Sequence, residues 1–313
     1  MAAAVCSVSI DLDPLGCYYG IHGLGAPPAG LADVVLRRGL PRFLGLLAER
    51  GITATFFVVG EDLDPGGAGE AARGELRQAV ARGHELGNHS HHHRYALTRL
   101  PADEIGAEID RAHARITELA GQPPVGFRSP GYNINGALIT AVAARGYTYD
   151  SSLLPAPAYY GAKAAVMAAM GLLGRRSQSV LGDVRQLWAG RLPYRPDERS
   201  PWRRGHSRLV ELPVTVTPRL RVPVIGTPIV TMPDFLRARL LDAVSGLPFF
   251  NFELHGIDLV DAELDGIPAA LVARQPDLRV PLARKRACLE DALSRIARRF
   301  TFAPLREVAA AFE

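Results

Sequence analysis

The sequence predicts an α/β fold, a single distorted (β/α) barrel of about seven strands with an inserted segment after the fifth strand. β-Branched and aromatic runs alternate with segments that carry apolar residues at helical spacing along most of the chain. Polar residues follow several of these strands, at the end where barrel enzymes hold their active sites. No stretch of the 313 residues has the composition of an interdomain linker. We therefore expect one domain over residues 1–313, with the insertion at about 155–205.

The first half of the chain supplies five predicted strands and the helices between them. The predicted strands span residues 5–13, 53–60, 85–89, 125–128 and 147–152. The predicted helices span residues 31–49, 69–82, 102–120 and 135–145. The Gly/Pro-rich connection 14–30 contains Tyr18, Tyr19 and His22 and is long for a simple link. We expect it to be a loop that faces the substrate.

The alternation breaks between residues 155 and 205. Residues 158–173 are rich in Ala, Met and Leu, but sixteen residues are fewer than the roughly 20 needed to cross a bilayer. They predict either a buried helix or a helix that lies on a membrane or along a lipid substrate. The alternation then resumes. Further strands are expected at 209–216, 249–255 and 300–302, and further helices at 233–245, 282–299 and 305–312.

Charge and cysteine content narrow the class of protein. The net charge is +4, and arginines concentrate between residues 175 and 221, where they form either a phosphate-binding patch or a solvated surface. No recognition motif accompanies them, so we expect no nucleic-acid partner. The three cysteines lack paired spacing, which argues against a disulfide framework or a thiolate metal site. No signal peptide is evident, so we expect a cytoplasmic protein, with peripheral attachment to the inner membrane face as the alternative.

A histidine-rich stretch, residues 83–95, holds five of the nine histidines. His89 and His93 are four residues apart, which would place both on one face of a helix, and imidazole is a preferred ligand of zinc and related metals. Two ligands do not make a site, because a third protein ligand and an open position are also needed. The stretch is therefore either a metal site or a solvated histidine-rich loop.

Candidate partners for this stretch lie at the predicted carboxyl ends of other strands. They are Asp11, Asp13, Arg128, Asp150 and His255. Asp11 and Asp13 share a face of their strand because side chains alternate with a period of two. One acid can complete a two-histidine, one-carboxylate metal site, the other can act as a base, and a distant histidine can act as an acid. The set predicts a hydrolase.

Four motifs in order resemble those of the metal-dependent polysaccharide deacetylases, carbohydrate esterase family 4 (NodB-like). They are Ser9-Ile10-Asp11-Leu12-Asp13, His89-Ser90-His91-His92-His93, Arg128-Ser129-Pro130-Gly131-Tyr132 and Leu254-His255. The resemblance covers most of the chain. It implies one divalent metal ion, with zinc as the expected ion, held by Asp13, His89 and His93. It also implies that Asp11 is the base that takes a proton from the attacking water.

The resemblance assigns further roles by motif position. His255 would protonate the departing amine, Arg128 would pair with Asp11, and a backbone N–H near Tyr132 would hold the oxyanion. The predicted substrate-binding residues are Tyr18, Pro130 and Asp150. His84, His91 and His92 match no role in the motifs, and we expect them to pack or face solvent.

Two departures from the common pattern qualify the resemblance. Leu12 separates the two aspartates, which are adjacent in most of the family; the split spacing resembles a branch with certain peptidoglycan deacetylases and lipid-linked aminoarabinose deformylases. The usual Asp-Trp-Arg-Pro segment, which supplies the partner of the acid histidine, is not evident. Glu211 and Asp258 are the candidates for that partner of His255.

The predicted function is metal-dependent N-deacetylation of an amino sugar, on a glycan that is lipid-linked or carries phosphate. The expected partners are an N-acylated sugar and a membrane surface or lipid-linked substrate. Deformylation of a lipid-linked amino sugar and hydrolysis of a non-sugar cyclic amide are alternatives of the same chemical type. A non-catalytic glycan-binding module is the alternative from another class, and it would have no need of a base beside a metal.

Overall fold

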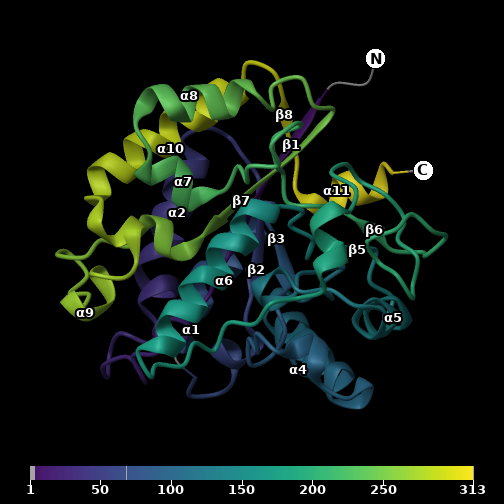
Figure 1. Ribbon diagram of the computed structural model, residues 1–313, viewed down its shortest axis with the longest axis horizontal. Helices are drawn as coiled ribbons and strands as arrows, with labels where there is room; N and C mark the ends of the chain where they lie inside the picture. The colour runs from purple at the N-terminus through teal and green to yellow at the C-terminus, as the bar shows by residue number, and fades with distance from the viewer. Residues whose placement is uncertain (1–3, 68, 313) are drawn as a thin grey trace.

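The computed structural model describes residues 4–67 and 69–312 and has an α/β barrel-like fold built on one parallel sheet (Figure 1). The strands follow the order β6-β5-β4-β3-β2-β1-β7, and the short β8 pairs with the start of β1. Their bounds are β1 (Val5–Asp11), β2 (Thr55–Val58), β3 (Glu85–Asn88), β4 (Gly126–Phe127), β5 (Tyr149–Asp150), β6 (Val210–Glu211), β7 (Phe249–His255) and β8 (Thr301–Phe302). The predicted fold class is confirmed.

The barrel closes between β6 and β7 without a regular ladder. The chain beyond β6 turns toward β7, where the backbone N–H of Thr215 donates to the carbonyl of Asn251 over 3.2 Å. Asn251 in turn donates two hydrogen bonds, one from its backbone N–H to Thr215 Oγ1 (2.9 Å) and one from its side-chain amide to the carbonyl of Leu212 (3.1 Å). The strand predicted at 209–216 is therefore only two residues long. Pro213, which has no N–H to donate, stands where the ladder stops.

Helices surround the sheet in Figure 1. The α-helices are α1 (Leu15–Ile21), α2 (Leu40–Ala48), α3 (Arg73–Ala81), α4 (Ala102–Ala120), α5 (Gly136–Ala144), α6 (Pro157–Leu172), α7 (Gly226–Thr231), α8 (Asp234–Asp242), α9 (Ala269–Val272), α10 (Leu282–Ile296) and α11 (Leu305–Ala310). Single helical turns of 3₁₀ type connect several of them. Among the described residues, no helix combines the length and the apolar character that crossing a bilayer requires.

Four helices depart from the sequence predictions. Residues 14–30 were expected to be a loop but contain α1, whose seven residues are too few to show helical periodicity. The helix predicted at 31–49 begins as a π-helical turn, Val35–Gly39, before α2. Pro41 explains this change, because it has no N–H to bond four residues back. The short helices α7 and α9 were missed for the same reason as α1.

Alternation along β1 and β7 separates an apolar layer from a polar barrel interior. Phe250, Phe252 and Leu254 pack in the core cluster beneath the helices, and the alternate residues of β7 face the other way. That opposite face carries Asn251, Glu253 and His255, all on one side of the strand. The polar interior continues to the carboxyl edge of the sheet, where β1 and β7 end together with Asp11 paired to His255.

Candidate active site

A cavity of about 320 Å³ opens at the carboxyl edge of the sheet. The strand register explains why distant segments meet there, since Asp11 of β1 lies beside His255 of β7, and Asn88 of β3 lies beside Phe127 of β4. The residues that follow β3 and β4 therefore begin at the same height along the sheet. The cavity is lined by Asp11, Asp13, Tyr18, Ile21, His22, His89, Tyr95, Gly131, Tyr132, Tyr159, Ala162, Lys163, Val166, Met167, Ser177, Ser179 and His255.

Asp13, His89 and His93 form a buried triad with the composition of a metal site. Asp13 Oδ1 lies 3.2 Å from His89 Nε2 and 3.1 Å from His93 Nε2. The possible ligand atoms of the three side chains lie within 4.8 Å of one another. Asp13 Oδ1 and His93 Nε2 are buried without a hydrogen-bond partner among the described residues, as expected of atoms arranged to bind an ion. Two imidazoles and one carboxylate fit zinc or a related divalent transition metal.

The hydrogen bond made by the other nitrogen of His89 sets its tautomer. His89 Nδ1 lies 2.7 Å from the carbonyl oxygen of Arg128, which can only accept, so Nδ1 carries the proton. The lone pair of Nε2 is then directed toward Asp13. Burial opposes ionisation of Asp13, but the two imidazoles outweigh it and hold the pKa of Asp13 well below its usual value. The carboxylate is therefore in the form that binds a cation.

The two histidines converge through an irregular turn and not through a helix. Ser90 and His93 have φ values of 61° and 50°, in the left-handed region that residues other than glycine seldom adopt. The expectation that His89 and His93 share a helical face is therefore wrong. The two left-handed residues bring both rings to Asp13 instead. Such conformations cost of order 1–3 kcal/mol each and persist where the surrounding contacts impose them, which is common at functional sites.

Cys17 of α1 supports the triad from behind. Its Sγ lies 3.1 Å from His93 Nδ1, on the side of the ring away from Asp13. No role was predicted for Cys17, because α1 itself was not expected. We predict that Cys17→Ala lowers metal affinity by about tenfold, since loss of a ligand's outer partner typically costs 10–100-fold. Metal titration would test this, with Cys288→Ala as the control, and unchanged affinity would remove Cys17 from the site.

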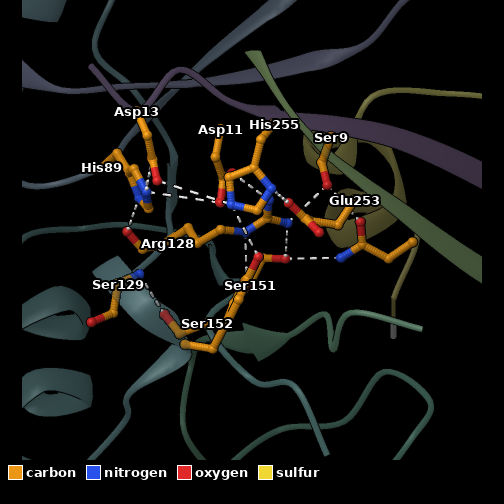
Figure 2. A network of polar contacts seen from close by, with 12 residues as sticks. Ser9, Asp11, Asp13, His89, Arg128, Ser129, Ser151, Ser152, Glu253 and His255 are labelled. Carbon is orange, nitrogen blue, oxygen red and sulfur yellow. Dashed lines mark hydrogen bonds and ion pairs between the residues drawn. The ribbon is translucent and has the colours of Figure 1, made fainter. Parts of the chain in front are cut away.

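Arg128 connects Asp11 to the polar interior of the barrel (Figure 2). Its Nη1 donates to Asp11 Oδ1 over 2.6 Å, and its Nε donates to the carbonyl of Ser151 over 2.9 Å. Its Nη2 donates to the hydroxyls of Ser9 and Ser151, both at 2.9 Å. The guanidinium is fully buried over the ring of Phe57, 4.2 Å from its centroid. This network holds the Asp11 carboxylate at one orientation, with its other oxygen 3.8 Å from His89 Nε2.

His255 faces the cavity from the other side, with Glu253 behind it (Figure 2). His255 Nδ1 lies 2.9 Å from Glu253 Oε1, and Nε2 lies 3.9 Å from Asp13 Oδ2. Burial lowers the pKa of His255, but the Glu253 carboxylate outweighs it and raises the pKa well above its usual value. The raised pKa favours the protonated ring, which is the form that a proton donor needs.

Glu253 corrects the expected partner of His255. Glu211 lies elsewhere, beside Asp150 in the register of β5 and β6, and Asp258 accepts from the backbone N–H of His255 and not from its ring. The sequence did contain a signal, because Glu253 and His255 are two apart in one strand and must share a face.

The remaining predicted residues are divided between the cavity and the surrounding core. Tyr18 lines the cavity, with its hydroxyl buried and unpartnered among the described residues. Tyr132 also lines it, and its hydroxyl lies 3.4 Å from His255 Nε2. Its backbone N–H, however, donates to the carbonyl of Ser129 over 3.2 Å, so the predicted oxyanion contact would require this turn to rearrange.

Pro130 and Asp150 do not line the cavity. Pro130 is buried at the start of the turn that presents Gly131 and Tyr132. Asp150 is fully buried and accepts hydrogen bonds from the hydroxyl and the N–H of Ser152. Its predicted substrate contact is therefore wrong, because the strand carries this side chain into the packed edge of the sheet.

The three unassigned histidines are held by packing contacts. His84 is buried, and its Nδ1 accepts from the N–H of Ala54 over 3.0 Å. His91 is also buried, and its Nε2 lies 3.3 Å from Asp64. His92 pairs with Glu108 on α4 over 2.5 Å. None of the three lines the cavity, and they pack as expected, with His92 remaining partly exposed.

Comparison with known proteins supports a family. Residues 32–149 match the polysaccharide deacetylase family, a region that holds His89, His93 and Arg128 but is less than half of the chain. A peptidoglycan deacetylase of Helicobacter pylori is 25% identical over 149 residues, covering 46% of this chain and 48% of that protein. The peptidoglycan deacetylase-like protein FGM2 of Gibberella zeae is 29% identical over 151 residues, covering 47% of this chain and 43% of that protein. The match spans less than half the length of each relative.

Solved structures extend the similarity to the whole fold. A Mycobacterium smegmatis protein described as a polysaccharide deacetylase aligns with a TM-score of 0.61 at 19% identity, over 98% of this chain and 90% of that one. The allantoinase Puue aligns with a TM-score of 0.58 at 17% identity, over 98% of this chain and 89% of that one. At these identities the likeness concerns the fold alone. Residues 32–149 are thus similar to the polysaccharide deacetylase family, and the whole chain shares the fold of these solved structures.

Proposed function

We propose that this protein is a metal-dependent amidohydrolase that removes the acetyl group from the nitrogen of an amino sugar. One observation carries the proposal: two members of the buried Asp13–His89–His93 triad, Asp13 and His89, line one cavity together with the buried carboxylate of Asp11 and the ring of His255. A base and an acid on either side of a metal triad are what amide hydrolysis requires. The family match supports the acyl-sugar substrate class.

Asp13, His89 and His93 would hold the ion. A divalent ion bound there supplies Lewis-acid polarisation of the acyl oxygen and lowers the pKa of the attacking water. Asp11 takes one proton from that water as the oxygen adds to the acyl carbon. Arg128 orients Asp11 throughout, because four of its five N–H groups are engaged.

His255 completes the reaction at the nitrogen. Amide nitrogen leaves only as a neutral amine, so it must gain a proton as the carbon–nitrogen bond breaks. His255 Nε2 carries that proton, and Glu253 stabilises the charged ring before transfer. The products are the free amino sugar and a carboxylate.

A screen of acyl substrates tests the proposal. The protein would be loaded separately with Zn²⁺, Co²⁺ and Mn²⁺ and incubated with N-acetyl and N-formyl amino sugars and with a cyclic amide, with products detected by mass. We expect acetate release that disappears with chelator and returns when metal is added. Preferential formate release or ring opening would redirect the assignment to a deformylase or a cyclic amidase. Metal-dependent sugar binding with no turnover would indicate a binding module.

The pH profile tests the role of Glu253. We predict that Glu253→Gln moves the alkaline limb of the rate profile to lower pH, because the raised pKa of His255 depends on this carboxylate. His255 acts in its protonated form, which persists until the pH passes its pKa in the folded protein. Lowering that pKa therefore shortens the active range from the alkaline side. An unshifted limb would show that another group sets it. Glu290→Gln, a partly exposed change on α10, is the control.

We propose further that the natural substrate is lipid-linked or phosphate-bearing and that the protein docks peripherally at the inner membrane face. α6 is mostly exposed, unlike the other long helices, and its end presents Leu172 and Leu173 with exposed fractions of 90% and 74%. Arg175 and Arg176 follow directly. Exposed leucines beside arginines suit the boundary between acyl chains and anionic headgroups.

Vesicle binding tests the membrane proposal. We expect cosedimentation with anionic phosphatidylglycerol vesicles at low salt, weaker binding at high salt, and loss of binding when Leu172 and Leu173 are both changed to Asp. The same double change at Leu264 and Leu220, two exposed leucines outside α6, is the control. Absence of vesicle binding at low salt would contradict docking.

A further inference from the structure

The outer wall of the cavity is one face of α6. Tyr159, Ala162, Lys163, Val166 and Met167 all line it. Their spacing of three and four residues is that of one helical face. This helix comes from the inserted segment, crosses in front of the central strands in Figure 1, and has no counterpart among the sequence motifs of the site. The part of the cavity lining that α6 contributes therefore comes from the inserted segment and not from the motifs of the site.

The start of α6 is attached to the site itself. The hydroxyl of Tyr160 donates to the carbonyl of Tyr132 over 3.1 Å, and the ring of Tyr159 packs edge-on against that of Tyr132. Tyr132 in turn contacts His255. Lys163 lies one turn farther along the helix than Tyr159. The rise of an α-helix places its Cα about 6 Å farther along the helix axis.

Lys163 brings a positive charge that the protein does not neutralise. No carboxylate of the described residues lies within 4.0 Å of its Nζ, which instead lies 5.6 Å from the ring centroid of Tyr160. Residues 151–182 contain no Asp or Glu at all, so the whole segment around it is basic or neutral. The neighbouring outer wall is formed by His22, Ser177 and Ser179. None of these groups carries negative charge; His22 Nε2 contacts Gln275, and the hydroxyl of Ser177 donates to the carbonyl of Ile21.

The two carboxylates in the cavity lie on its inner side and already have partners. Asp11 is paired with Arg128, and Asp13 belongs to the triad. Burial lowers the pKa of Lys163 to about 8, and a bound anion would offset this desolvation by favouring the charged form. A lysine that is half buried in a cavity wall and has no acidic partner is well suited to bind a ligand that carries a negative charge.

We propose that Lys163 forms an anion subsite that selects amino-sugar substrates bearing a phosphate or carboxylate in addition to the acylated nitrogen. The inference rests on the proposed amidohydrolase function and deepens it by naming the substrate class. Ser177 and Ser179 border the subsite. The two sources of the anion, a sugar phosphate and a sugar acid, share the same oxyanion chemistry and are separated by experiment.

Steady-state kinetics on the metal-loaded protein test the subsite. The probes are N-acetylglucosamine 1-phosphate, N-acetylmuramic acid and neutral N-acetylglucosamine oligomers. We expect Lys163→Met to raise KM for the preferred anionic probe by about 10–100-fold, the usual effect of losing one charge-assisted contact, and to leave kcat/KM for the neutral probe within about twofold. Lys163→Arg should restore most of the preference. Arg77→Met, an exposed change on α3 outside the cavity, is the matched control.

A binding measurement separates failure of the subsite from failure of the catalytic proposal. Calorimetry would compare glucose 1-phosphate and glucuronate with glucose on the wild-type protein and on Lys163→Met. Tighter binding of one anionic sugar that is lost in Lys163→Met supports the subsite even if no probe is hydrolysed. Equal binding of charged and neutral sugars, or an equal rise in KM for all probes in Lys163→Met, overturns it even if hydrolysis proceeds.

Discussion

Replacing Asp11 with asparagine is expected to lower kcat for amide hydrolysis by about 10²–10⁴-fold, the usual contribution of a positioned base. The amide of asparagine keeps the shape of the side chain but cannot accept the proton of the attacking water. The metal should remain bound, because Asp13, His89 and His93 are unchanged. Rates would be measured alongside metal content by mass spectrometry.

The control for Asp11→Asn is Asp110→Asn. Asp110 also accepts from an arginine, Arg145, over 2.6 Å, but its side chain is 60% exposed and lies away from the cavity. The control should retain full activity. If Asp11→Asn hydrolyses the substrate at the wild-type rate with its metal in place, Asp11 is not the base.

Replacing Arg128 with leucine is expected to destabilise the fold by about 3–5 kcal/mol, because it leaves the buried Asp11 charge without its partner. Hydrolysis should fall as well, since Asp11 loses the contact that orients it. Urea unfolding would measure the first effect and kcat the second. Arg128→Lys keeps the positive charge but replaces the forked guanidinium by a compact ammonium group. It should therefore recover only part of the lost stability and activity.

Two comparisons distinguish the buried ion pair from a general loss of packing. Arg145→Leu breaks the exposed pair with Asp110 and should cost no more than about 1 kcal/mol. The double change Asp11→Asn with Arg128→Leu removes both charges and should be more stable than Arg128→Leu alone. If the double variant is less stable than Arg128→Leu, the pairing energy is not the main contribution of Arg128.

Much of the site could be predicted because its residues lie at the ends of strands. Parallel strands bring their carboxyl ends to one edge, so Asp11, His89, Arg128 and His255 were expected to meet before any contact was known. The pairing of Arg128 with Asp11 was implied by the family resemblance of the two motifs. The strand β7 was predicted over its full observed length because seven residues show their alternation clearly.

Features that depend on irregular backbone were not predictable in the same way. The left-handed residues Ser90 and His93 have no signature in the residue types found there. The helix α1, which brings Cys17 behind His93, is shorter than two full helical repeats. Asp150 was assigned to the substrate on its position at a strand end, although the direction of a side chain depends on the register of the strand.

The sequence by itself determined the βα alternation, the parallel sheet and the donors that gather at its edge, because these follow from local periodicity and strand direction. Only the tertiary structure decided that Glu253 supports His255, that the backbone of Arg128 orients His89, and that α6 brings Lys163 over the cavity. Each of these depends on contacts between segments far apart in the chain. Such contacts are set by packing and register, which leave no pattern in the local order of residues.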